Sequence, residues 1–144
     1  MVGHIVAALR QSPLVRELEV GEMIDEASVQ LLRVRAELID GSFLYVREAI
    51  FPHTSKYSYH WQTSTGEMLL RWDNAPHHPE IPTHPHHKHD GERIGSAARV
   101  SIEDVLAELA TRLQSKGERA NKVSLSAPEQ RGNPPCSASK TTNS

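Results

Sequence analysis

A chain of 144 residues predicts a single domain. Its 16 Lys or Arg against 18 Asp or Glu exclude the strong basic field of a sequence-independent nucleic-acid binder. One cysteine, Cys136, excludes an internal disulfide, and no apolar run is long enough to cross a bilayer, so we expect a cytoplasmic protein without a membrane partner.

The N-terminal part predicts a short helix followed by paired strands. Residues 2–10 place apolar side chains at helical spacing, and Ser12-Pro13 ends that run. Strands are expected over 14–24, 29–39 and 42–51. The last two meet across Asp40-Gly41, which is typical of a two-residue hairpin loop. That register pairs Ala36 with Tyr45, Leu38 with Phe43 and Arg33 with Glu48, and it puts Phe43 and Tyr45 on the core face.

A second hairpin is expected where residues 57–62 and 68–73 alternate in polarity around Thr65-Gly66. A two-residue loop pairs Ser64 with Glu67 and His60 with Arg71. The aromatic and apolar side chains then share one face, namely Tyr57, Tyr59, Trp61, Leu70 and Trp72. His60, Arg71 and Asp73 share the other face. This polar group is either a solvated face of little energetic value or part of a site, and the histidines that follow favour a site for Arg71 and Asp73.

A histidine-rich arm follows, in which Pro76, Pro79, Pro82 and Pro85 recur at every third residue. This period predicts polyproline II, whose ridge neighbours lie about 9 Å apart. Zinc holds each imidazole at about 2 Å, so a straight arm cannot chelate a metal unless it bends or borrows a ligand from the hairpin. After Pro85 the chain can enter another strand, with His87 and His89 on one side and His86 and Lys88 on the other.

Residues 101–116 predict a helix, with Ser101 as N-cap, Asp104 as its capping partner and Gly117 just beyond the end. From residue 118 to 144 the composition predicts disorder, which leaves one domain over 1–117. The fold class that follows is α+β: an antiparallel meander of four to five strands, one or two packed helices and a Pro/His-rich arm.

The central stretch resembles a known family. The segments YSYHWQ (57–62), RWDNAPHHP (71–79) and PHHKH (85–89) are similar to the signature of TumE-like toxins of prokaryotic toxin–antitoxin modules. The resemblance covers roughly residues 28–114. It implies a small cytoplasmic toxin and a cognate antitoxin, often a helix-turn-helix DNA-binding protein. His84 departs from the pattern, standing where an aromatic residue is expected, and the tail after Gly117 is extra.

Small toxins of this kind often cut RNA, which needs a base, an acid and cations for the phosphorane charge. Histidine suits both proton transfers, Arg71 and Lys88 suit the charge, and Asp73 could orient an imidazole. The candidate catalytic residues are therefore His60, Arg71, Asp73, His86, His87, Lys88 and His89. The candidate substrate-binding residues are Asn74, His77 and His78.

We expect no required cofactor for this chemistry. The alternative function is a non-catalytic module that binds a protein, or a divalent metal such as zinc, through the histidine-rich arm. The sequence does not predict an oligomeric state.

Overall fold

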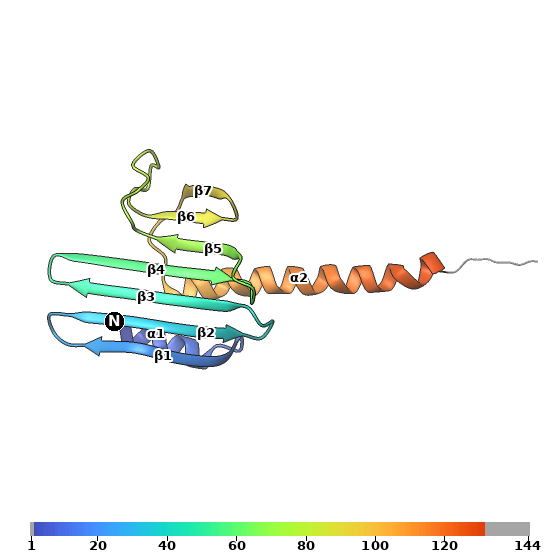
Figure 1. Cartoon of the computed structure of the whole chain (residues 1–144), viewed down its shortest axis with the longest axis horizontal. Helices are drawn as coiled ribbons and strands as arrows, with labels where there is room; N and C mark the ends of the chain where they lie inside the picture. Colours follow the sequence, from blue (N-terminus) through green and yellow to red (C-terminus); the bar gives the residue numbers. More distant parts are fainter. Residues whose placement is uncertain (1, 132–144) are drawn as a thin grey trace, which may run out of the picture. The chain divides into compact units, whose positions relative to one another are not determined.

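The computed structural model describes residues 2–131, with the side chains of residues 2–116. The chain divides into two units, Met1–Ala107 and Glu108–Ser144. Its elements in chain order are α1 (Val2–Gln11), β1 (Val15–Asp25), β2 (Gln30–Leu38), β3 (Phe43–Phe51), β4 (Thr54–Gln62), β5 (Met68–Asp73), β6 (His87–Asp90), β7 (Arg93–Ser96) and α2 (Ile102–Arg131) (Figure 1). The α+β class is confirmed.

The sheet is an antiparallel meander whose seven strands lie side by side in chain order. The two short strands β6 and β7 make the predicted count of four to five too low. The sequence raised β6 as a possible strand after Pro85 but missed β7, which is four residues long and has no alternation of apolar and polar residues. Gly91, with a φ of 63°, forms the turn between them.

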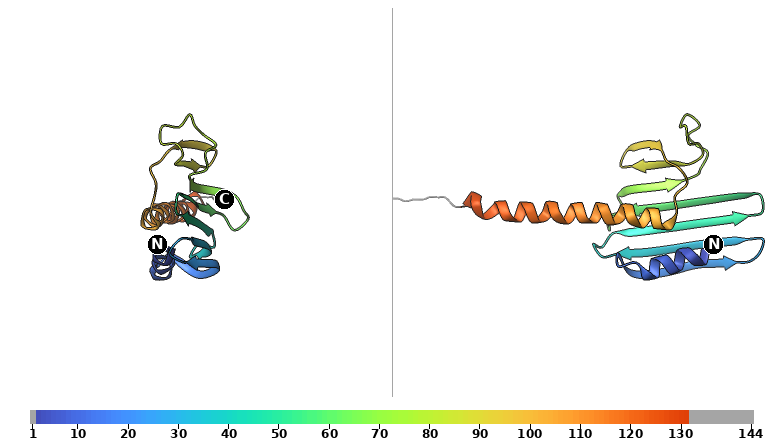
Figure 2. Two further views of the ribbon diagram at one scale, coloured as in Figure 1. Left: turned by 90° about the vertical axis from the view of Figure 1, so that its left-hand side faces the viewer. Right: turned by 180° about the vertical axis from the view of Figure 1, so that it is seen from behind.

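One face of the sheet is apolar and helps to form the core. Its buried side chains include those of β2, β3, β4 and β5, namely Leu32, Val34, Ala36, Leu38, Leu44, Val46, Tyr57, Tyr59, Trp61, Leu70 and Trp72. The predicted helix α1 packs against β1 and β2 and buries its apolar stripe, Val2, Ile5, Val6 and Leu9 (Figures 1 and 2). The other face, which carries Arg35, Tyr45, His60, Arg71 and His89, is called the polar face below.

The hairpin of β4 and β5 has the predicted register over its functional residues. His60 pairs with Arg71, Tyr59 with Trp72 and Ser58 with Asp73. A bulge between Trp61 and Gln62 then shifts the pairing, so the predicted partnership of Ser64 and Glu67 is wrong. Instead the Thr63 amide donates to the Glu67 carbonyl at 2.8 Å. The bulge lies beyond the polar residues and leaves their face unchanged.

The predicted register of β2 and β3 is wrong by one residue. Ala36 pairs with Leu44 rather than with Tyr45. The cause is the loop, because the Leu38 amide donates to the Ser42 carbonyl at 2.8 Å and three residues, not two, connect the strands. A shift of one residue exchanges the faces of a strand, so Tyr45 lies on the polar face.

The same shift corrects the expected partner of Glu48. This carboxylate is 7% exposed and lies on the apolar face. There it accepts hydrogen bonds from Arg99 Nη2 at 3.0 Å and from the Tyr59 hydroxyl at 3.2 Å, and Arg33 is not its partner.

Helix α2 begins as predicted and ends later. The Ser101 hydroxyl accepts from the Asp104 amide at 3.1 Å, and the Ser101 amide donates to the Asp104 carboxylate at 3.0 Å, which completes the capping box. The predicted end at Gly117 is wrong, since the helix continues to Arg131. Many of the residues after Gly117 are strong helix formers, and a single glycine weakens a helix by only about 1 kcal/mol.

The helix thus includes residues 118–131 of the stretch for which we expect disorder, while residues 132–144 lie outside the described part. Within the described part, neither helix combines the length and the apolar character that crossing a bilayer requires.

Candidate active site on the polar face

The candidate site is built from three neighbouring strands and the arm between β5 and β6. Strand pairing places His60, Arg71 and His89 in one row across β4, β5 and β6. The next row along β5 and β6 pairs Asp73 with His87. Residues two positions apart in a strand point to the same face of the sheet. The predicted strand after Pro85 therefore places His89 beside Arg71 and His87 beside Asp73.

Asp73 is the hydrogen-bonding hub of the site, and it is only 5% exposed. Its Oδ2 accepts from Arg71 Nε at 2.8 Å, and its Oδ1 accepts from the Ala75 amide at 2.9 Å. His87 Nε2 lies 3.1 Å from the same Oδ1. Burial alone would raise the pKa of the Asp73 carboxyl, but these hydrogen bonds and the charges of His87 and Arg71 outweigh it and lower that pKa.

His87 is held by oxygen acceptors on both sides of its ring. Nδ1 lies 3.0 Å from the Pro85 carbonyl, and Nε2 faces Asp73. A carbonyl and an ionised carboxylate only accept, so a proton on either ring nitrogen of His87 has an acceptor. Buried to 3% exposure, the ring pairs with Asp73 at the floor of the site.

His60 and His89 flank Arg71 and are better exposed than His87. Arg71 Nη1 donates to His60 Nδ1 at 3.2 Å, so His60 carries its proton on Nε2, which lies 3.1 Å from the Gln62 side-chain oxygen. Burial, with the charge of Arg71, lowers the pKa of His60. Burial, with the charge of His87, also lowers the pKa of His89. Both effects favour the neutral rings that can accept a proton.

The arm does not form the predicted straight polyproline II segment. Turns close through hydrogen bonds from the Ile81 amide to the His78 carbonyl at 3.1 Å and from the His84 amide to the Ile81 carbonyl at 2.9 Å. The Ile81 side chain is buried, and its burial favours a compact arm over a straight one. The arm therefore bends, which is the condition under which its histidines can approach a common metal ion.

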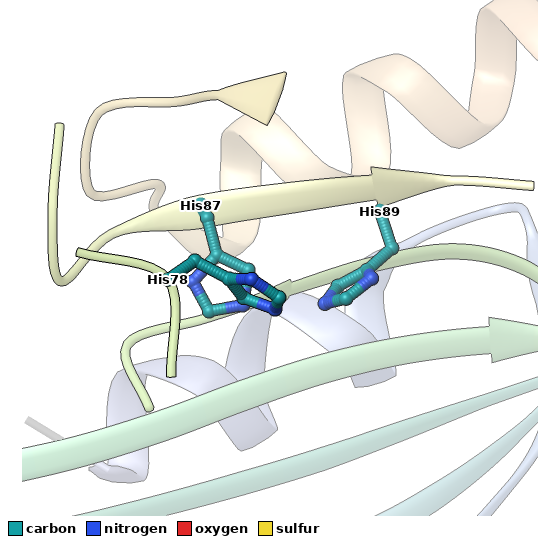
Figure 3. A group of neighbouring side chains, drawn as sticks. All are labelled: His78, His87 and His89. Carbon is teal, nitrogen blue, oxygen red and sulfur yellow. The ribbon is translucent and has the colours of Figure 1, made fainter. Parts of the chain in front are cut away.

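The bend brings His78 to the two histidines of β6 (Figure 3). Each of His78, His87 and His89 offers a ligand atom, and these atoms all lie within 4.8 Å of one another. The ring centroids of His78 and His87 are 5.0 Å apart, and those of His87 and His89 are 4.9 Å apart. Among the described residues, these three histidines are the set that could hold a metal ion.

Two candidate catalytic residues lie on the other side of the sheet. His86 Nδ1 lies 2.8 Å from the Tyr57 hydroxyl, on the apolar face. Lys88 Nζ lies 5.2 Å from the centre of the Trp72 ring. Neither side chain lies beside Arg71, because His86 contacts Tyr57 and Lys88 contacts Trp72 on the apolar face, while Arg71 lies on the polar face. Burial also raises the pKa of Tyr57 to about 12, so its hydroxyl stays protonated.

The candidate substrate-binding residues are divided between a pocket and the histidine cluster. Asn74 and His77 line a pocket of about 460 Å³, whose wall also contains Lys56, Arg71 and Asp73. The Asn74 side chain is engaged by β4, since it accepts from the Tyr57 amide at 3.0 Å and donates to the Ser55 carbonyl at 2.9 Å. His78 belongs to the cluster instead.

Tyr45 and Phe43 extend the polar face beyond the predicted residues. Tyr45 pairs with His60 across the strands, and their ring centroids are 6.3 Å apart. Phe43 follows at 6.4 Å from Tyr45, with the Arg35 guanidinium 5.1 Å from its ring centre. Sequence analysis missed both rings because it expected a two-residue loop between β2 and β3. The loop from Leu38 to Ser42 has three residues between its ends, and this places the rings on the polar face.

The chain matches the family model described as Toxin TumE over residues 5–114. The match spans well over half of the chain and includes every residue of the site. It confirms the resemblance seen in the sequence and extends it to α1 and β1. No curated protein and no solved structure matches the chain.

Proposed function

The chain belongs to the TumE toxin family, and from this premise we propose that it is a toxin that cleaves RNA on the polar face of its sheet. Membership of a toxin family implies a cognate antitoxin. In our proposal that antitoxin is a helix-turn-helix DNA-binding protein, and the toxin acts on cytoplasmic RNA.

The observation that carries the proposal is the row of His60, Arg71 and His89. Neighbouring strands lie about 4.8 Å apart, so the row sets one imidazole on each side of a guanidinium. Arg71 is 35% exposed, its Nε donates to Asp73 and its Nη1 donates to His60, so Nη2 is the nitrogen that we assign first to a ligand. Guanidinium binds phosphate oxygens strongly and in a defined orientation.

A phosphodiester bound to Arg71 would have a proton acceptor and a proton donor on opposite sides. One histidine removes the proton of the ribose 2′-hydroxyl, whose oxygen attacks phosphorus. The bond from phosphorus to the 5′-oxygen breaks, and the protonated form of the other histidine supplies the proton for that oxygen. The products are a 2′,3′-cyclic phosphate and a 5′-hydroxyl. Arg71 stabilises the charge that develops on the phosphorane.

Asp73 and His87 position this machinery rather than touch the substrate. Both side chains are nearly buried, at 6% and 3% exposed. The short bond from Arg71 Nε to Asp73 fixes the plane of the guanidinium, and the Asp73–His87 pair fixes the carboxylate. Such fixed donors need little reorganisation when charge develops in the transition state.

The surroundings suit a single-stranded RNA. Phe43 and Tyr45 extend from His60 as aromatic surfaces on which bases can stack, a mode of contact worth about 1–3 kcal/mol per base. Arg47, on the same face of β3, is exposed, and Lys56 lines the pocket beside Arg71. Among the strand residues of the polar face from β3 to β6, Arg47, Lys56 and Arg71 outnumber the one carboxylate, Asp73, which supports a polyanionic substrate.

The row of histidines gives the first test, in cells and with purified protein. We expect His60→Ala and His89→Ala each to lower RNA cleavage roughly 10²–10⁴-fold, because each removes one proton-transfer group. Both variants should relieve the growth arrest caused by the parent. His84→Ala is the matched control, since this histidine of the arm is exposed and lies outside the row.

Each variant must keep the melting temperature of the parent, so that loss of activity is not loss of fold. If well-folded His60→Ala and His89→Ala proteins arrest growth as strongly as the parent at equal levels, the row is not the active site. A non-catalytic binding module then becomes the better interpretation.

A further inference from the structure

His78, His87 and His89 form a cluster at the bend of the arm, and the proposed RNA cleavage does not use all three. His89 belongs to the row with Arg71 and His87 supports Asp73, but His78 has no part in the proposed reaction. Yet the arm delivers the His78 ring to within 5.0 Å of the His87 ring and 5.9 Å of the His89 ring (Figure 3). The close approach of three imidazoles is costly when they are charged, and it is favourable when they share a cation.

The nitrogens that point away from the cluster already have acceptors. His87 Nδ1 lies 3.0 Å from the Pro85 carbonyl, and His78 Nδ1 lies 3.3 Å from a Glu80 carboxylate oxygen. Metal-binding histidines almost always donate their second N–H to a carboxylate or a carbonyl, which fixes the ring and directs the other nitrogen to the metal. Two of the three rings therefore have the orientation of metal ligands.

From this arrangement we propose that His78, His87 and His89 bind a divalent transition-metal ion, and that Zn²⁺ suits them best. Imidazole nitrogen is a preferred zinc ligand, and three such ligands leave a fourth position for water or for an Asp73 oxygen. His87 Nε2 and Asp73 Oδ1 are 3.1 Å apart, close to the roughly 3.3 Å between two ligands of a tetrahedral ion with bonds of about 2 Å.

The cluster can close on an ion without moving the sheet. With bonds of about 2.0–2.1 Å, a tetrahedral ion needs ligand atoms about 3.3–3.4 Å apart, so atoms at the 4.8 Å limit within which they lie must approach by about 1.4 Å. His87 is buried, and His78 and His89 are 26% and 20% exposed. The buried ring thus provides a fixed ligand toward which the two partly exposed rings can rotate.

Metal binding has a consequence that rests on the proposed function. A zinc ion occupies the His89 nitrogen that would otherwise transfer a proton beside Arg71. The metal-bound toxin would therefore be inactive by the proposed route, while loss of the ion would restore the row.

Titration calorimetry with Zn²⁺ on the untagged, chelator-stripped full chain tests the site. We expect one ion to bind per chain. His78→Ala should weaken binding by more than the 10–100-fold typical of losing only a supporting partner, because it removes a direct ligand. His84→Ala, a change in the same arm, should bind like the parent. No saturable binding of one ion by the parent, or equal binding by a folded His78→Ala protein, would overturn the proposal.

Two further experiments distinguish failure of the metal site from failure of the proposed RNA cleavage. His89→Gln repeats the binding test should His78→Ala lose the parent's melting temperature, and its equal binding would also overturn the site. Cleavage is followed in parallel, where added Zn²⁺ should inhibit the parent and spare His78→Ala. If the parent binds zinc but does not cleave RNA in chelator, the metal site stands and the proposed function is rejected. If the parent cleaves RNA but does not bind zinc, the proposed function stands and the metal site is rejected.

Discussion

Alanine at Arg71 is expected to lower the rate of RNA cleavage by at least about 10²–10³-fold and to abolish growth arrest. Loss of a single fixed donor to a developing oxyanion typically costs that factor, and Arg71 contributes a full charge as well. Lysine at the same position keeps the charge but not the planar fork that Asp73 orients, so Arg71→Lys should recover only part of the rate. Single-turnover cleavage of a labelled oligonucleotide measures both variants.

The control for this change is Arg33→Ala on the same face of the sheet. Arg33 is 60% exposed and its nitrogen is 3.7 Å from a Glu22 oxygen, so its ion pair should contribute about 0–1 kcal/mol. It also lies on β2, away from the row. If folded Arg71→Ala protein cleaves RNA as fast as Arg33→Ala protein, the phosphate is not bound at Arg71.

Alanine at Asp73 should have the largest effect on stability among the residues of the site, about 3–5 kcal/mol of the free energy of unfolding. Asp73 is the nearly buried member of an ion pair with Arg71, and its removal would also leave His87, at 3% exposed, without the acceptor that faces its Nε2. Arg71 and the Ala75 amide would lose their acceptors at the same time. Urea unfolding at pH 7 in chelator, with the slope compared between variants, measures the loss.

Asp73→Asn is the informative partner of that variant. The asparagine side-chain oxygen can still accept from the Ala75 amide, but the substitution removes the negative charge beside His87 and Arg71. We expect a smaller loss of stability than with alanine and a similar loss of cleavage, because the guanidinium is no longer fixed. A change of less than 1 kcal/mol for Asp73→Ala would mean that the contacts of Asp73 with Arg71, His87 and the Ala75 amide do not stabilise the fold.

The hairpin of the site was predictable because its signals agree with one another. Between residues 57 and 73 the alternation of aromatic and polar side chains leaves one register that buries Trp61 and Trp72 together, and Gly66, with a φ of 98°, supplies the turn. The bulge at Gln62 lies between the turn and the functional residues, so the error it introduced did not reach His60 or Arg71.

The hairpin of β2 and β3 shows why equally plain signals can fail. Asp40-Gly41 suits a two-residue loop, but the Asp40 carboxylate accepts from the Ser42 amide at 3.0 Å and also from its hydroxyl. Ser42 in turn accepts from Trp61 Nε1 at 2.8 Å, a contact with β4 that the local sequence does not reveal. The resulting register shift of one residue moves Tyr45 from the expected core face to the polar face.

The arm was mispredicted because its period was interpreted without its tertiary contacts. Prolines at every third residue favour polyproline II only where the backbone stays solvated. Here the Thr83 hydroxyl donates to the His86 carbonyl at 2.6 Å and accepts from the Ala97 amide at 2.9 Å, which ties the arm to the chain beyond β7. Together with the turns at Ile81 and His84, these contacts accompany a bent arm, in which His78 meets His87 and His89 as a straight arm would not allow.

The chemical ends of the RNA fragments test the central claim most directly. Purified parent protein, held in excess chelator, is incubated with a single-stranded RNA and with the same RNA lacking its 2′-hydroxyls. We predict fragments that end in a 2′,3′-cyclic phosphate and begin with a 5′-hydroxyl, and no cleavage of the second substrate. Intact RNA, or fragments with a 3′-hydroxyl and a 5′-phosphate, would contradict cleavage by the row of His60, Arg71 and His89.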